Sequence, residues 1–310
     1  WSSVIFIQQY GGAPVKLAVL PEYVLTSYPG RISIPDFAEK AALEVDGPEY
    51  EALGKIAQEQ KLFLSGNAYE ADKNFPGIYF QTCFIIGPNG NVVLRYRRLN
   101  SMFAPTPHDV WSKYLDIYGL DGVFPVAKTD LGNIAMMPCG EIMYPEAARM
   151  FMFRGAEVLL HPTSDHGASD KWSWESAKKV RASENMMYLI SANQCGQVGG
   201  PLPTGTTAGH SKIYDWDGRV LSDSGGPGES AVCTSWIDVE ALRRMRSIPG
   251  SGNRLLRQRI DIYRPLYNAT TLYPANRFAD APMDSKQRIV EVQQESYRNL
   301  VKSGLILSFP

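Results

Sequence analysis

Short apolar runs alternate with helix-length segments along this 310-residue chain, and the alternation limits the folds open to it. It indicates an α/β domain, because strands that pair in a sheet must be covered by the helices that connect them. Helices are expected at 47–59, 145–154, 172–186 and 284–303. Six runs have the length and composition of strands: 16–20 (KLAVL), 62–66 (LFLSG), 84–87 (FIIG), 133–137 (NIAMM), 157–161 (EVLLH) and 187–193 (MYLISAN).

Two turn sequences indicate that the sheets are mixed rather than purely parallel. GPNG at 87–90 and DWDG at 215–218 place turn residues between apolar flanks, which predicts hairpins. No change of composition marks a linker, so we expect one domain over 1–263 with a C-terminal extension over 264–310. The last predicted helix is amphipathic and has an apolar stripe formed by Ile289, Val290, Tyr297, Leu300 and Val301.

Charge and cysteine content exclude several classes of protein. The 32 acidic and 31 basic side chains nearly cancel, so neither nucleic acid nor an anionic membrane is an expected partner. No apolar run approaches the roughly eighteen residues of a membrane span, and nothing resembles a secretory signal, so we expect a cytoplasmic protein. The cysteines have no CxxC or zinc-site spacing, which predicts neither a disulfide framework nor a metal site; they are Cys83, Cys139, Cys195 and Cys233.

Cys139 stands where a strand ends and a helix is about to begin. NIAMMP precedes it and YPEAARMFMFRG follows it closely. Ligands of open α/β sheets bind at the carboxyl edge of the strands, and a helix N-terminus there favours thiolate. Local sequence leaves two interpretations open, a nucleophile or a buried, inert thiol.

Glu22 occupies a similar place after the run 16–20 and Pro21. A carboxylate at a strand's carboxyl edge can serve as the general base that a cysteine nucleophile needs. The alternative is an exposed loop glutamate.

Several motifs in register resemble the carbon–nitrogen hydrolases of the nitrilase superfamily, most closely the aliphatic amidase branch. The resemblance spans about residues 12–240, and its motifs are LAVLPEYVLTSYPG, VLRYRRL, CGEIMYPEAARMFMFRGAEVLLHPTS, RASENMMYLISANQCG and GHSKIYDWDGRVL. Its strongest part is the pattern C-x-[DE]-x-x-[YF]-P-E, filled by Cys139, Glu141, Tyr144, Pro145 and Glu146.

The resemblance implies a four-layer α-β-β-α sandwich with mixed sheets, and a catalytic cysteine that needs no metal or organic cofactor. The cysteine attacks an amide or nitrile carbon, ammonia or an amine leaves, and water hydrolyses the thioester. Carried over by position, Cys139 is the nucleophile and Glu22 the base.

Two further positions depart from the family pattern. Arg98, in Tyr96-Arg97-Arg98, stands where the family has its catalytic lysine. Arginine is always charged, so it can stabilise an oxyanion but cannot act as a proton donor. Asp109, in TPHDVW, stands where amidases have a second glutamate. Lys113 is an alternative source of the missing ammonium, although we prefer to interpret it as an exposed lysine.

Four other residues are expected around the substrate: Glu141, Tyr144, His210 and Trp172. Core packing is the alternative for Trp172, and a structural role beside the nucleophile for Glu141. His161, His166 and His210 match no metal-binding pattern and are interpreted as loop histidines near the site.

The start of the chain is shorter than the family pattern, which opens with a strand and a long helix. We interpret WSSVIFIQQYGG as the end of that helix with the first strand missing; the alternative is that VIFIQ is itself a strand.

The leading hypothesis is therefore thiol-dependent hydrolysis of a C–N bond in a small amide, carbamoyl compound or nitrile. Because Arg98 replaces lysine, a second hypothesis is a catalytically impaired fold that binds a ligand or partner. A third is transfer of the acyl group to an acceptor other than water. The resemblance also implies a homodimer or larger homo-oligomer, with the C-terminal extension at the interface.

Overall fold

Two mixed β-sheets form the centre of the protein. The computed structural model describes residues 14–26, 28–30, 32–102, 104–165, 172–195, 207–226, 232–279 and 285–308. The first sheet contains β1 (Leu17–Val19), β2 (Leu43–Glu44), β3 (Phe63–Ala71), β4 (Tyr79–Ile86) and β5 (Val92–Arg97). The second contains β6 (Ala127–Thr129), β7 (Gly132–Met136), β8 (Val158–Thr163), β9 (Tyr188–Asn193), β10 (Lys212–Tyr214) and β11 (Val220–Asp223).

Both sheets mix parallel and antiparallel pairs, as the two turn sequences predict. In the first, the order is β1-β3-β4-β5 with β2 also on β3, and β1 and β2 run parallel to β3. In the second, the order is β11-β10-β9-β8-β7-β6, and β7, β8 and β9 are parallel. The predicted hairpins join β4 to β5 and β10 to β11, which confirms both.

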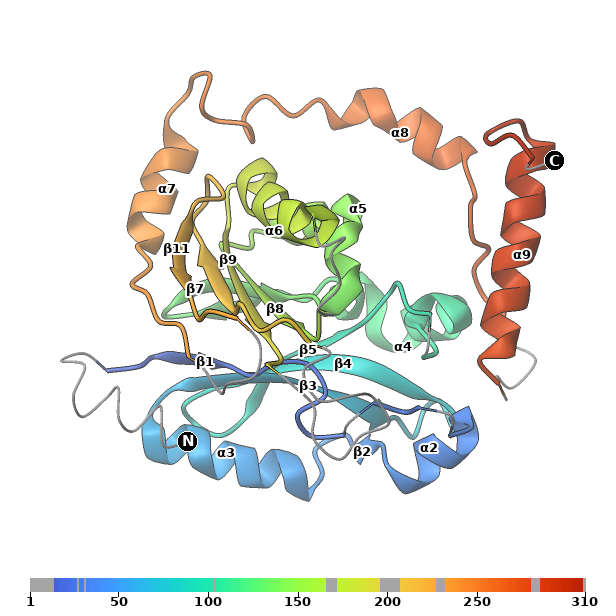
Figure 1. Cartoon of the computed structure of the whole chain (residues 1–310), viewed down its shortest axis with the longest axis horizontal. Helices are drawn as coiled ribbons and strands as arrows, with labels where there is room; N and C mark the ends of the chain where they lie inside the picture. Colours follow the sequence, from blue (N-terminus) through green and yellow to red (C-terminus); the bar gives the residue numbers. More distant parts are fainter. Residues whose placement is uncertain are drawn as a thin grey trace.

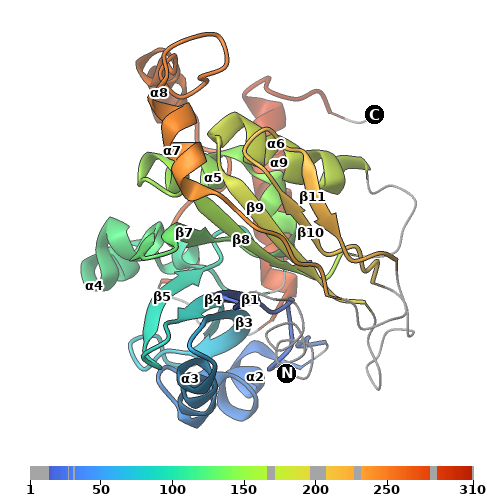
Figure 2. The ribbon, with the colours of Figure 1, turned by 90° about the vertical axis from the view of Figure 1, so that its left-hand side faces the viewer.

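Helices cover the outer faces of the two sheets, so the chain forms four layers (Figures 1 and 2). α2 (Ile34–Lys40) and α3 (Pro48–Gln60) lie on the first sheet, and α5 (Pro145–Phe153) and α6 (Trp172–Asn185) on the second. The largest apolar cluster joins both inner faces, with Ile85 and Tyr96 from one sheet and Leu159 and Leu189 from the other. This confirms the expected α-β-β-α sandwich, and every predicted strand and helix is present within a few residues.

Several further elements are present beyond those expected, although capping residues such as Ser33, which precedes α2, mark some of them in the sequence. The further elements are β2, β6, the 3₁₀ helices η1 (Pro107–Val110) and η2 (Cys139–Met143), α2, α4 (Trp111–Val123), α7 (Val239–Ser247) and α8 (Ile260–Ala269). The segment WSSVIFIQQYGG lies outside the described residues, so neither interpretation of it is tested.

The C-terminal helix α9 (Gln287–Lys302) packs on the body of its own chain. Ile289 and Val292 are buried in a cluster that includes Ile34 and Phe37 of α2. Val290 and Tyr297, predicted to belong to the same stripe, are 39% and 44% exposed. The buried stripe is therefore rotated relative to the predicted one. In the described part of the chain, no helix is long and apolar enough to span a membrane.

Close packing of α3 on the β4–β5 turn generates a first prediction. Alanine normally stabilises a helix by about 1 kcal/mol relative to glycine. At Gly54, however, a Cβ would lie only 2.5 Å from the carbonyl oxygen of Gly90. We expect Gly54→Ala to lower the free energy of unfolding by roughly 1–3 kcal/mol in urea denaturation. The exposed α3 substitution Lys55→Ala serves as the control, and a stabilised Gly54→Ala protein would contradict the packing.

Candidate active site

Glu22, Arg98 and Cys139 meet at the ends of three strands from the two sheets. Glu22 follows β1, Arg98 follows β5, and Cys139 begins the 3₁₀ helix after β7. The Cys139 thiol and the Glu22 carboxylate lie close enough to interact, and the charge of Glu22 raises the pKa of the thiol. Arg98 Nη1 lies 3.8 Å from Glu22 Oε1. Three of the four residues that the sequence analysis places in catalytic roles thus converge.

Donors from both sheets hold the fully buried carboxylate of Glu22. Gln81 Nε2, in β4, donates to Oε1 over 2.5 Å, and Ser164 Oγ, just after β8, donates to Oε2 over 2.6 Å. These two donors orient the carboxylate that is the candidate general base.

Two hydrogen bonds hold the guanidinium of Arg98. Nε donates to the carbonyl of Asn100 over 2.7 Å, and Nη1 donates to Gln81 Oε1 over 2.9 Å. Burial acts to lower the pKa of Arg98, but the charges of Cys139 and Glu22 outweigh it and raise the pKa. Within the described residues these hydrogen bonds use Nε and Nη1, while Nη2 lies beside Gly140.

Cys139 sits in a left-handed backbone conformation, with φ of 51°. Such a conformation costs a non-glycine residue about 1–3 kcal/mol unless its surroundings hold it. Here His161 Nε2 lies 2.9 Å from the carbonyl oxygen of Cys139, and Nδ1 lies 2.9 Å from Ser191 Oγ. Burial, with the charge of Lys178, lowers the pKa of His161 to about 4, so the ring is neutral at pH 7 and Nε2–H donates to Cys139.

Electrostatics keep the thiol protonated in the resting site. Burial first, and then the charge of Glu22, raise the pKa of Cys139 to about 12, while the charge of Arg98 lowers it. A protonated thiol beside a carboxylate can transfer its proton as it attacks, so Cys139 and Glu22 can serve as a nucleophile and its base.

Glu141 links the nucleophile's turn to the end of β5. Its buried Oε1 accepts hydrogen bonds from the backbone N–H groups of Leu99 and Asn100, at 2.9 and 3.0 Å. Its Oε2 accepts one from Tyr96 Oη at 2.7 Å. These contacts set the position of the segment that carries Arg98 relative to Cys139.

Three residues on one face of α6 contact the segments around Cys139 and Ser164, and they are spaced four and three positions apart. Trp174 lies against Gly140, and Lys178 forms a buried ion pair with Asp165, the residue after Ser164. Arg181 donates from Nε to the carbonyl of Ile142 over 3.0 Å. The helix therefore fixes the turn that carries the nucleophile.

The structure does not bring Asp109 to the other catalytic candidates. Its buried carboxylate accepts hydrogen bonds from Thr106 N and Thr106 Oγ1, both at 2.8 Å, and another from Tyr273. Burial raises its pKa. No hydrogen bond or ion pair between described residues connects it to Glu22, Arg98 or Cys139.

Of the remaining candidates, Tyr144 and His210 have partly exposed side chains, and Lys113 packs on an aromatic ring. The Tyr144 side chain is 47% exposed, and His210, at 49% exposure, lies 3.0 Å from Asp223 Oδ1. Lys113 Nζ lies over the ring of Phe75. His166 and the side chain of Trp172 lie outside the described residues. His161 is inside β8 and fully buried, so its interpretation as a loop histidine was wrong.

Comparison with known proteins identifies the family. The model of the family "Carbon-nitrogen hydrolase" matches residues 3–247. The chain belongs to this family. The resemblance to the nitrilase superfamily is thereby confirmed, and the protein is an enzyme of the class that hydrolyses carbon–nitrogen bonds.

Relatives and solved structures agree with this assignment. Omega-amidase NIT2 of Xenopus tropicalis is 24% identical over 231 residues, which cover 74% of this chain and 79% of that protein. Human omega-amidase NIT2 is 24% identical over 241 residues, 78% and 83% of the two chains. Nit3 of Saccharomyces cerevisiae, a nitrilase superfamily member, has a similar fold with a TM-score of 0.61 at 19% identity. The match covers 81% of this chain and 86% of that one.

A solved amidase is similar in fold and has a modified cysteine. A mutant of the Nesterenkonia sp. AN1 amidase was solved with the acetamide moiety of fluoroacetamide covalently added at its active site cysteine. Its TM-score is 0.58 at 18% identity, and the match covers 85% of this chain and 87% of that one.

Sequence reasoning missed the residues that hold this hydrolase's candidate site together. Ser164 had a usable signal, because it follows a strand as Glu22 and Cys139 do. Gln81 had a weaker one, as a polar residue inside the apolar strand β4. Lys178 had none, and His161 was expected near the site but in a loop rather than inside β8.

Replacing the candidate base should separate thiol ionisation from turnover. Glu22 raises the pKa of Cys139, so Glu22→Gln should lower that pKa and shift alkylation of Cys139 by iodoacetamide to lower pH. Amide hydrolysis should nevertheless fall by about 10²–10⁴-fold, because the proton acceptor is lost. Alkylation rates of the parent and the variant would be compared by mass spectrometry from about pH 7 to pH 10, below the parent's thiol pKa of about 12, where the rate follows the small thiolate fraction. An alkylation profile that moves to higher pH would contradict the contact.

Proposed function

We propose that this protein hydrolyses the C–N bond of a small amide through a thioester on Cys139. The observation that carries the proposal is the contact of the Cys139 thiol with the carboxylate of Glu22, beside the guanidinium of Arg98. The omega-amidase relatives and the amidase modified at its cysteine support it.

In the first half-reaction Glu22 takes the thiol proton as Sγ attacks the amide carbonyl carbon. The developing oxyanion lies within the field of Arg98, which stabilises it without exchanging a proton. The C–N bond breaks as Glu22 returns the proton to the leaving nitrogen, and ammonia or an amine departs. An acyl group remains on Sγ as a thioester.

In the second half-reaction Glu22 removes a proton from a water molecule that attacks the thioester carbon. Collapse of the tetrahedral intermediate breaks the C–S bond, and the proton returns to sulfur. The product is a carboxylic acid. The neutral His161 and the carboxylate of Glu141 act on the backbone around Cys139 and take no part in proton transfer.

Amides are the proposed substrates, with carbamoyl compounds and nitriles as alternatives. The same thioester can pass to an amine or hydroxylamine, which keeps acyl transfer as a further alternative. From their places in the family pattern, Asp109 is proposed to help position substrate or water, and Tyr144, His210 and Trp172 are proposed to contact substrate.

The decisive test combines turnover with selective labelling. We expect the parent to hydrolyse members of a panel of small aliphatic amides, and Cys139→Ala to lower turnover by more than about 10³-fold. Iodoacetamide at high pH should label Cys139 faster than the fully buried Cys83. Cys83→Ala is the matched control and should retain activity. Full activity in Cys139→Ala would contradict the proposal.

Arginine at position 98 favours a second candidate, a binding protein that has lost catalysis. The substitution Arg98→Lys decides between the two. An inactive parent with an active Arg98→Lys variant would support the binding protein, whereas an active parent with a weaker variant makes arginine a working part.

We also propose that the protein is a homodimer or larger homo-oligomer, with the C-terminal extension at the interface. α8 has no buried residue, and it arches above α5 and α6 (Figure 1). Tyr267 Oη of α8 donates to Glu146 of α5 over 3.0 Å. Ile262, Tyr263 and Leu266 are 60%, 54% and 73% exposed, an apolar surface that an isolated chain would leave in water.

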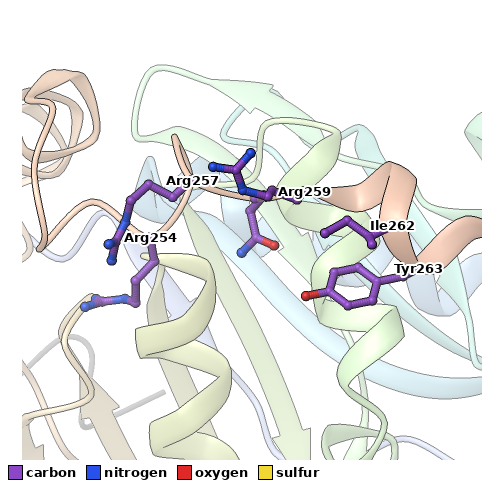
Figure 3. A pocket seen from close by; sticks show the side chains of 6 residues that line it. Arg254, Arg257, Arg259, Ile262 and Tyr263 are labelled. Carbon is purple, nitrogen blue, oxygen red and sulfur yellow. The ribbon is translucent and has the colours of Figure 1, made fainter.

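A basic pocket lies where the chain enters α8. It has a volume of about 420 Å³ and is lined by Arg254, Arg257, Gln258, Arg259, Ile262 and Tyr263 (Figure 3). Arginine and tyrosine are enriched at protein interfaces, which suits a contact between subunits.

The oligomer is tested by introducing a charge at its proposed centre. We expect light scattering to show an oligomer for the parent and a smaller species for Leu266→Asp, because the carboxylate would lose its hydration on assembly. Val93→Asp, at an exposed apolar position of β5, is the control. A parent that is monomeric at micromolar concentration would contradict the interface.

A further inference from the structure

Gly140 occupies a crowded position between Cys139 and Glu141. A Cβ built at this glycine would lie 3.3 Å from Trp174 Cη2 and 3.4 Å from Arg98 Nη2. The contact with Trp174 is tighter than an ordinary van der Waals contact, and the contact with Arg98 lies at the lower limit of one, so a Cβ here would press on both neighbours. Its φ is not in the left-handed range, so backbone conformation does not require glycine here.

Hydrogen bonds and an ion pair restrict the movement of both neighbours. Arg98 is held behind by Asn100 and Gln81, and Glu141 holds the backbone of Asn100. Trp174 belongs to α6, which Arg181 ties to the carbonyl of Ile142 and which Lys178 ties to Asp165. The space above Gly140 is therefore bounded on two sides by anchored groups.

We infer that Gly140 and Arg98 are a matched pair: the missing side chain at 140 leaves the room beside Cys139 that the guanidinium occupies. Arginine is broader than the lysine of the family pattern, and its second terminal nitrogen is the atom that lies over Gly140. Gly140 is thus a positioning residue, and it acts by fixing the distance between Nη2 and the reacting sulfur. In its effect on turnover, the inference rests on the proposed hydrolysis.

The inference predicts coupling between positions 140 and 98. Gly140→Ala, Arg98→Lys and the double variant form a double-mutant cycle with the parent. With arginine at position 98, Gly140→Ala should lower kcat by about tenfold with KM within about twofold, because small displacements of a catalytic group are costly. In a protein that already carries Arg98→Lys, the same change should cost less than about twofold, because lysine has no second terminal nitrogen over residue 140.

A second readout does not require turnover. Arg98 lowers the pKa of Cys139, so a displaced guanidinium should slow alkylation by iodoacetamide at one fixed, mildly alkaline pH. Gly140→Ala should slow it several-fold with arginine at position 98 and leave it unchanged with lysine there. If no variant hydrolyses any amide, the proposed function fails, and this alkylation cycle still decides the pairing.

Two controls make the pairing falsifiable. At Gly252 a Cβ would meet nothing within 4 Å, so Gly252→Ala should leave kcat, alkylation and thermal stability unchanged. Trp174→Phe removes the other close neighbour. Equal losses from Gly140→Ala with and without Arg98→Lys, or recovery of the Gly140→Ala variant by Trp174→Phe, would overturn the pairing with Arg98.

Discussion

The site depends on one buried carboxylate, that of Glu22. An ionised carboxylate without solvent is costly unless hydrogen bonds and an opposite charge surround it. Its donors come from opposite sheets, Gln81 from β4 and Ser164 from the end of β8, and Arg98 supplies the positive charge. The contacts that stabilise the buried carboxylate of Glu22 therefore also join the two sheets near Cys139, where β7 ends.

The nucleophile is placed by its backbone as much as by its side chain. Cys139 occupies a left-handed conformation, and His161 holds its carbonyl. Glu141 then ties the same turn to the residues that follow β5. Because these partners are buried and neutral or fully hydrogen-bonded, they can keep the strained turn rigid without taking protons from the reaction.

Membership of the carbon–nitrogen hydrolase family makes the departures from its pattern informative. Arg98 could have indicated a dead site, yet its guanidinium is hydrogen-bonded into the network of Glu22 rather than turned away. The space it fills lies over Gly140, one residue from the nucleophile. An arginine can replace the family's lysine and still function only if the site has room for the broader guanidinium. We infer that the glycine at position 140 provides this room.

Sequence by itself determined the alternation of strands and helices and both hairpins, because local periodicity and turn chemistry mark strand ends. The candidates Glu22, Arg98 and Cys139 followed from the resemblance of the motifs around them to the nitrilase superfamily. Only the tertiary structure decided their partners. Ser164 lies 142 residues from Glu22 and Gln81 lies 59, and no local pattern encodes such contacts. The same holds for Asp109, whose carboxylate bonds to its own turn at Thr106, because a capping acid and a catalytic acid look alike until packing shows what surrounds them.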